Sequence, residues 1–132
     1  MQEEWIPGIE DYLDLAEEVL GADRESLRKL PNLRLAESAL AAPFAEFGGT
    51  PAYEGVTVRA AELVTRLARN HPLPDGNKRA AFLTMATYLR ENGLAWDSED
   101  IELDAGIVER IASGVTTSDE VVAWIDSRTS SS

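Results

Sequence analysis

Apolar residues recur at spacings of three and four along most of the chain, and no other feature limits its possible folds as strongly. This spacing places apolar side chains on one face of an α-helix, whereas a half-buried strand alternates apolar and polar residues. The spacing is clearest over residues 9–20, 56–70 and 77–92, and the sequence contains no alternating segment. The pattern predicts an all-α fold, one compact domain of six or seven helices. Shorter helices are expected over residues 24–30, 33–42, 104–113 and 118–127.

Capping residues mark several of the expected helix ends. Asp23 and Asn32 precede two short helices and are expected to cap them. Thr117 and Glu120 form a capping-box pattern before the last helix. Residues 43–55 hold three glycines, two prolines and three aromatic residues without helical spacing. That composition predicts an ordered loop or a short hairpin between two helices.

Length and composition limit the class of protein. A chain of 132 residues suits one domain, expected over residues 1–128, with a disordered tail at 129–132. The absence of cysteine excludes disulfides and thiolate chemistry. No stretch of sequence is apolar enough to span a membrane, and the first residues lack the basic start of a signal peptide. These features predict a cytoplasmic protein that does not bind membranes.

The net charge of −12 disfavours direct binding to nucleic acid, because phosphate backbones repel an acidic chain. The charge is uneven, however. Residues 59–79 carry five basic residues and two acidic ones, which suits a small anionic ligand. Arg59, Arg66 and Arg69 in this basic segment are expected on a solvated helix face.

The basic segment ends in HPLPDGNKR, residues 71–79, which contains the only histidine of the chain. Gly76 allows a tight turn before a helix that starts at about Asn77. The first N–H groups of that helix lack intrahelical partners and carry the positive end of the helix dipole, which makes an anion site. Lys78 and Arg79 add two full positive charges there. The pattern favours binding of a phosphate group.

His71 and Asp75 add chemistry to this anion site. A neutral imidazole can accept a proton from an attacking hydroxyl, and a carboxylate beside phosphates suits Mg²⁺. A structural explanation also exists, because a lone loop histidine is often merely solvated and Asp75 or Asn77 could cap the next helix. Lys78 and Arg79 fit that explanation poorly, since a first helical turn favours acidic residues. The residues alone leave a nucleotide site and a structural turn as alternatives.

The segment HPLPDGNKR resembles the motif H-x-F-x-[DE]-[GA]-N-[GK]-R of the Fic/Doc family. Residues 35–93 as a whole look like the Doc (death-on-curing) branch of that family. The resemblance implies an enzyme that uses ATP and Mg²⁺ to modify a protein hydroxyl, with residues 43–55 as a flap that lines the groove for the target segment. His71 is implied as the general base and Asp75 as the Mg²⁺ ligand. The implied catalytic residues are His71, Asp75, Asn77, Lys78 and Arg79, and the implied phosphate cradle is Gly76, Asn77, Lys78 and Arg79.

Three positions depart from the wider family pattern. Leu73 replaces the usual Phe and is expected to anchor the loop in the core. Lys78 stands where adenylyl-transferring members have Gly, and Phe82 stands where they have a second Arg. In the Doc branch this combination is associated with a reversed nucleotide, whose γ-phosphate faces the histidine. The resemblance therefore implies a protein Ser/Thr kinase.

The resemblance also implies partners. Doc-branch proteins are toxins that phosphorylate elongation factor Tu and so inhibit translation, and a small antitoxin of the Phd type neutralises them. We therefore expect an elongation factor Tu-like substrate and a Phd-type partner. Two other hypotheses remain open. One is a Fic-type enzyme that transfers AMP or another nucleotide to a protein hydroxyl. The other is a non-catalytic helical binding module that keeps the motif as a fold element.

Overall fold

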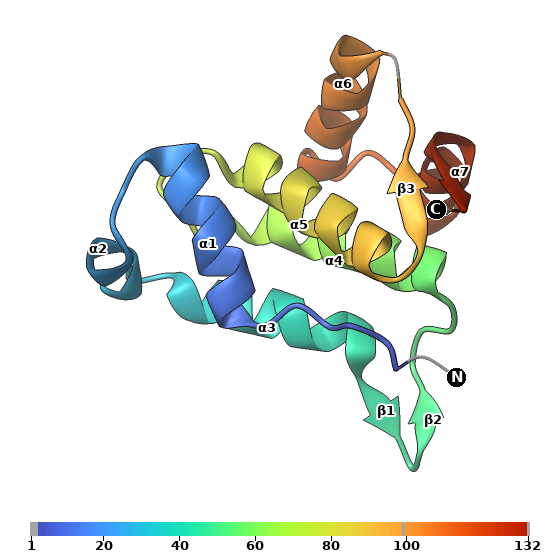
Figure 1. The fold of residues 1–132 in the computed structure, drawn as a ribbon, viewed down its shortest axis with the longest axis horizontal. Coiled ribbons are helices and arrows are strands. Elements are labelled where there is room, and N and C mark those ends of the chain that lie inside the picture. Colours follow the sequence, from blue (N-terminus) through green and yellow to red (C-terminus); the bar gives the residue numbers. More distant parts are fainter. Residues whose placement is uncertain (1–2, 99, 132) are drawn as a thin grey trace.

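The computed structural model describes residues 3–98 and 100–131 (Figure 1). Within these residues it contains seven α-helices and four short strands, which confirms the predicted all-α class. The helices are α1 (Ile9–Leu20), α2 (Arg24–Arg28), α3 (Leu33–Ala41), α4 (Val56–Asn70), α5 (Asn77–Glu91), α6 (Ile101–Ala112) and α7 (Ser118–Arg128). The strands are β1 (Glu46–Phe47), β2 (Thr50–Pro51), β3 (Leu94–Trp96) and β4 (Thr129–Ser131), and one 3-10 turn covers Ala42–Phe44.

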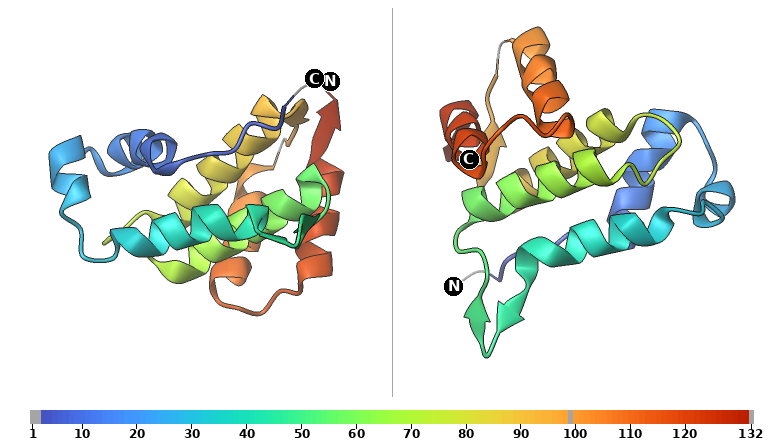
Figure 2. Two further views of the ribbon diagram at one scale, coloured as in Figure 1. Left: turned by 90° about the horizontal axis from the view of Figure 1, so that it is seen from below. Right: turned by 180° about the vertical axis from the view of Figure 1, so that it is seen from behind.

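Helices α4 and α5 form the centre of the molecule, and each packs along the other. Helices α1, α2 and α3 lie on one side of this pair, while α6, α7 and the β3–β4 ribbon lie on the other side (Figures 1 and 2). Each central helix buries a wide stripe of side chains, including Leu63 and Leu67 of α4 and Met85 and Leu89 of α5. The side chains that fill the core come from both sides, and the largest fully buried ones include Tyr12, Leu13, Leu63, Leu67, Met85, Tyr88, Leu89, Ile111 and Ile125.

The predicted helix caps are present with one exception. The side chain of Asp23 accepts a hydrogen bond from Ser26 N, and Thr117 and Glu120 form the complete capping box. Asn32 precedes α3, but its side chain makes no capping hydrogen bond, so that prediction is wrong. Its backbone (φ −101°, ψ 13°) is not in the extended conformation that brings an N-cap side chain over the first turn.

The ribbon of β3 and β4 has no counterpart in the sequence analysis, which expects a disordered tail over residues 129–132. Thr129–Ser131 instead pair antiparallel with Leu94–Trp96, and Ser130 lies opposite Ala95. Ser132 lies outside the described residues. This pairing uses main-chain hydrogen bonds, so a short serine-rich strand leaves no apolar pattern by which to predict it. Among the described helices, none is both long and apolar enough to cross a membrane.

Residues 43–55 form the short hairpin that their composition predicts. Glu46 pairs with Pro51, and Phe47 pairs with Thr50. The hairpin projects from the body of the protein at the N-terminal end of α4 (Figure 1). Two arginines of α4 hold its base: Arg59 Nε donates to Tyr53 O at 2.9 Å, and Arg66 Nη2 donates to the Tyr53 hydroxyl at 3.1 Å.

Candidate functional site

The HPLPDGNKR segment forms the junction between α4 and α5. His71 ends α4 and lies exposed in the left-handed region, with φ 48° and ψ 55°. It is the one non-glycine residue with a positive φ in the described part of the chain. Such a conformation is uncommon for a residue with a Cβ atom, and strained positions of this kind cluster at functional sites. The predicted general base thus ends α4 in the left-handed conformation.

The loop is held by a pair of hydrogen bonds between Asn77 and Leu73. The Asn77 Oδ1 atom accepts from Leu73 N at 2.9 Å, and Asn77 Nδ2 donates to Leu73 O at 2.8 Å. Leu73 itself is only 4% exposed, as expected for the residue that anchors the loop. Asn77 is predicted to belong to a phosphate cradle. In the structure its side chain fixes the loop backbone, which suits a role in positioning the site.

Gly76 and Asp75 complete the turn into α5. Gly76 has φ 73°, and a Cβ atom added there would lie 2.5 Å from Val19 Cγ1 of α1. Glycine is therefore required both by the backbone angle and by the close approach of α1. The Oδ1 atom of the exposed Asp75 accepts a hydrogen bond from Gly76 N at 2.8 Å. Asp75 is thereby oriented at the entrance to α5, and its second carboxylate oxygen makes no hydrogen bond within the described residues.

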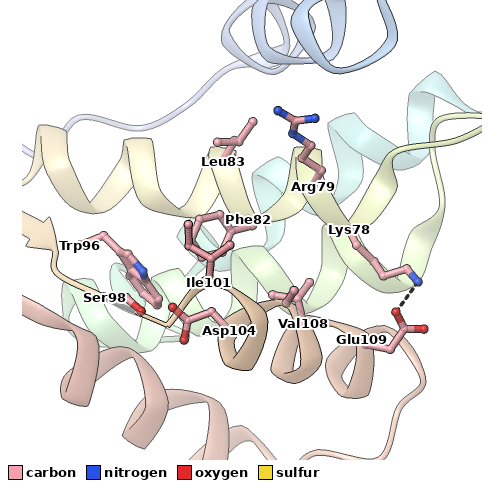
Figure 3. A pocket seen from close by; sticks show the side chains of 11 residues that line it. Lys78, Arg79, Phe82, Leu83, Trp96, Ser98, Ile101, Asp104, Val108 and Glu109 are labelled. Carbon is pink, nitrogen blue, oxygen red and sulfur yellow. Dashed lines mark hydrogen bonds and ion pairs between the residues drawn. The ribbon is translucent and has the colours of Figure 1, made fainter.

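The first turn of α5 is open to an anion. No side chain caps it and no acidic residue occupies it. Lys78 and Arg79 extend from this turn in different directions (Figure 3). Lys78 Nζ lies 2.8 Å from Glu109 Oε2 of α6, whereas Arg79 has no carboxylate partner among residues 3–98 and 100–131. Free N–H groups, the helix dipole and the Arg79 charge together favour a phosphate at this position.

The other three arginines of the basic segment make contacts within the fold. Arg69 is exposed, as expected for a solvated helix face, whereas Arg59 and Arg66 are partly buried. Arg59 forms an ion pair with Glu4 at 2.9 Å, and Arg66 forms one with Glu62 at 3.0 Å. Arg69 Nε donates to Ile111 O at 2.8 Å and so ties α4 to the end of α6. Lys78 and Arg79 are therefore the cations of the segment that lie at the candidate site.

A pocket of about 640 Å³ adjoins this first turn and lies between α5, β3 and α6. One end is formed by Lys78, Arg79 and Glu109, and Figure 3 shows these residues apart from the ring of Trp96 at the other end. Its remaining lining residues are Phe82, Leu83, Ser98, Ile101, Asp104, Ala105 and Val108. The volume is in the range of about 300–1,000 Å³ that is usual for small-molecule sites.

The residues fit a Mg²⁺ ion only together with a phosphate. The described residues contain no group of three or more His, Cys, Asp or Glu side chains that could hold a metal. Asp75 can supply one carboxylate oxygen. Mg²⁺ commonly takes one or two carboxylates and completes its shell with phosphate oxygens and water. The single carboxylate beside an anion site is compatible with that pattern.

The hairpin of residues 43–55 does not lie beside His71. It precedes α4, whereas His71 follows α4, and the two are separated by a helix of 15 residues. At a rise of about 1.5 Å per residue this helix is roughly 22 Å long. Figure 1 shows the hairpin and the α4–α5 junction at opposite ends of the central pair. The structure therefore places this hairpin away from the motif, at the other end of α4.

Sequence reasoning missed the residues that form the far end of the pocket. Trp96, Ser98 and Asp104 come from β3 and α6, well after the motif. Asp104 was expected only as the start of a helix, yet it is 5% exposed. The sequence did hold a signal, because Asp104 occupies a core-facing position of an amphipathic helix. A buried acidic residue needs polar partners, so this position could have indicated a polar cluster.

The chain is similar to proteins of a known family. The model of the Fic/DOC family matches residues 3–89, which include α1, the hairpin and the whole α4–α5 junction. A curated protein named Toxin Doc, from Mycolicibacterium smegmatis, is 33% identical over 117 residues. The match covers 86% of this chain and 89% of that protein. The similarity thus extends beyond the motif into α6.

Proposed function

The chain belongs to the Doc branch of the Fic/DOC family, and on this basis we propose that it is the toxin of a toxin–antitoxin module with protein Ser/Thr kinase activity. The observation that carries the proposal is the open first turn of α5. There Lys78 and Arg79 stand at the entrance of a pocket of about 640 Å³, next to the junction that bears His71.

The proposed reaction moves the γ-phosphoryl group of ATP to a hydroxyl of a target protein. His71 accepts the hydroxyl proton while the hydroxyl oxygen forms a bond to the γ-phosphorus. The bond between that phosphorus and the β–γ bridging oxygen breaks, and ADP leaves with the electron pair. The N–H groups of α5 and the guanidinium of Arg79 stabilise the charge on the phosphoryl oxygens. Asn77 keeps the loop, and with it His71, in position.

Asp75 would hold a Mg²⁺ ion against the phosphates. A bound Mg²⁺ neutralises phosphate charge and orients the phosphate oxygens. The contribution of this chain is the carboxylate, which the hydrogen bond to Gly76 N fixes at the start of α5.

Lys78 and Phe82 support transfer of the γ-phosphate rather than the nucleotidyl group. Phe82 lies one helical turn after Lys78, lines the pocket and is half-buried. An inner phosphate that lay beside Phe82 would face an aromatic ring without a counter-charge. Leaving a charged oxygen without a hydrogen-bond partner costs on the order of 1–3 kcal/mol or more. The preferred arrangement therefore keeps the terminal phosphate at the start of α5.

We propose an elongation factor Tu-like protein as the substrate and an antitoxin of the Phd type as the partner, on the basis of the family alone. Expression of the chain with and without a cognate antitoxin gene tests the toxin assignment. The intact chain should stop growth, and the antitoxin should restore it. A His71→Ala chain should be harmless while keeping the helical circular dichroism of the wild type. Growth arrest by that variant would contradict the proposed role of His71.

A further inference from the structure

The pocket beside α5 changes character along its length. Its first end carries the charges of Lys78, Arg79 and Glu109, whereas its far end is aromatic and contains one carboxylate, that of Asp104 (Figure 3). Lys78 and Phe82 lie about 6 Å apart along the helix axis, which is one turn. A ligand that spans the pocket must therefore have an anionic end and a flat apolar end.

Three aromatic rings build the far end. The ring of Phe82 meets Trp96 nearly edge-on, with centroids 5.2 Å apart and an interplanar angle of 88°. Trp96 in turn packs against Trp124 at 5.0 Å and 70°. Phe82 and Trp96 are both half-buried and line the pocket. Aromatic rings that line a pocket in this way are suited to stacking with a nucleobase.

Asp104 adds a hydrogen-bond acceptor beside these rings. Its Oδ1 atom accepts from Trp124 Nε1 and from Arg128 Nε, both at 2.9 Å. Burial alone would raise the pKa of Asp104, but hydrogen bonds from Ser98, Trp124 and Arg128, together with the charge of Arg128, lower it. The carboxylate is therefore ionised at neutral pH. Figure 3 shows the Asp104 carboxylate directed toward Ser98 and Trp96. Its second oxygen therefore faces the Ser98 hydroxyl at this end of the pocket.

We propose that this pocket binds the adenine base, with the base stacked on the ring of Phe82 and its edge toward Trp96, and with the exocyclic amino group donating to Asp104. The proposal rests on the proposed function, because it takes ATP as the ligand. It adds the subsite that selects the base. An ionised carboxylate accepts from the amino group of adenine and repels the carbonyl oxygen that hypoxanthine and guanine carry at the same ring position.

Calorimetric titration of the intact wild-type chain with ATP, ITP, GTP and inorganic triphosphate tests the proposal. ITP differs from ATP by a carbonyl in place of the amino group. The wild type should bind ATP at least about ten-fold more tightly than ITP, as expected for loss of a hydrogen bond to a charged group. It should also bind ATP more tightly than GTP or triphosphate. Equal affinity for ATP and ITP, or tighter binding of GTP, would overturn the proposal.

The variant Asp104→Asn provides a sharper test. Its amide oxygen can still accept from Trp124 and Arg128, while its amide nitrogen becomes a donor toward the pocket. This variant should bind ITP at least as tightly as ATP. The control Asp126→Asn, which removes an exposed carboxylate of α7, should keep the wild-type preference. An unchanged preference for ATP in Asp104→Asn would show that Asp104 does not select the base.

The variant Phe82→Leu tests binding of the base separately from binding of the phosphates. It should weaken ATP binding by about five-fold or more through loss of stacking and leave triphosphate binding unchanged. Failure of the two proposals can be told apart. A chain that selects adenine but transfers no phosphate keeps the base subsite and loses the kinase assignment. A chain that phosphorylates its target with ATP and ITP at equal affinity keeps the kinase assignment and loses the base subsite.

Discussion

Lys78 of α5 and Glu109 of α6 form an ion pair, with Nζ 2.8 Å from Oε2, at the charged end of the pocket (Figure 3). Both side chains are largely exposed, so the pair itself contributes little to stability. Its position matters more. A phosphate at the start of α5 must compete with Glu109 for Lys78, and the Glu109 carboxylate repels any anion that approaches.

Removal of this carboxylate should therefore strengthen nucleotide binding. Glu109→Gln is expected to raise the affinity for ATP by up to about five-fold, because an exposed pair is worth roughly 0.2–1 kcal/mol. Glu37→Gln removes the same charge from an exposed position on α3 and is the matched control. Calorimetry at low and high salt measures both. Equal gains in the two variants would indicate a general charge effect rather than release of Lys78.

Gly76 should tolerate no side chain. Gly76→Ala is expected to lower the free energy of unfolding by about 1–3 kcal/mol, through the positive φ and the contact with Val19. Gly114→Ala is the control, since Gly114 also has a positive φ (80°) but nothing lies within 4 Å of the added Cβ. Denaturant unfolding should show the smaller loss for Gly114→Ala.

A double-mutant cycle isolates the steric part of this effect. Val19→Ala removes the Cγ1 atom that the new Cβ would meet. The double variant Val19→Ala, Gly76→Ala should be more stable than the sum of the two single losses predicts. Strict additivity would mean that α1 does not restrict position 76.

Asn77 should act through the loop. Asn77→Asp keeps an acceptor for Leu73 N but cannot donate to Leu73 O, so its second oxygen faces a carbonyl. We expect faster hydrogen exchange at the Leu73 amide and a lower transfer rate, with little change in the helical circular dichroism. If the Leu73 amide exchanges as slowly as in the wild type but activity is lost, Asn77 contacts the phosphates directly rather than positioning the loop.

Asp104 should make the fold sensitive to acid. Its pKa in the folded chain is below the ordinary value of 3.8, so its ionised form stabilises the fold above about pH 4. That stabilisation is lost as the pH falls below this value and the carboxylate becomes protonated. Melting temperatures between about pH 5 and pH 2 should therefore fall more steeply for the wild type than for Asp104→Asn. Parallel curves would contradict the role of its hydrogen bonds with Trp124 and Arg128.

The helices and the open start of α5 followed from local chemistry and could be predicted from the sequence. Apolar spacing fixed the central helices because each buries a face along its own length. The glycine at position 76 and the cations at 78 and 79 indicated an open helix start because their roles depend on neighbours in sequence. The burial of Leu73 was expected from its place in the family motif, where Phe is usual.

Features that depend on distant segments could not be predicted. The partners of Arg59 and Arg69 are Glu4 and Ile111, which are 55 and 42 residues away along the chain. The pocket likewise needs α6 to lie across α5, and β4 needs β3 as a partner. A periodic pattern in the sequence carries no information about contacts between distant segments. The arginines were therefore predicted on a solvated face and residues 129–132 as a disordered tail.

The most direct test of the proposed reaction follows the two ends of ATP separately. The purified chain is incubated with elongation factor Tu, Mg²⁺ and ATP labelled either at the γ-phosphate or at the α-phosphate, with His71→Ala as the inactive control. Label from the γ-phosphate should enter the target on a Ser or Thr, with the mass gain of one phosphoryl group, and label from the α-phosphate should stay in solution. Transfer of the α-label, with the mass of an added nucleotide, would contradict the proposed orientation and make the chain a nucleotidyl transferase.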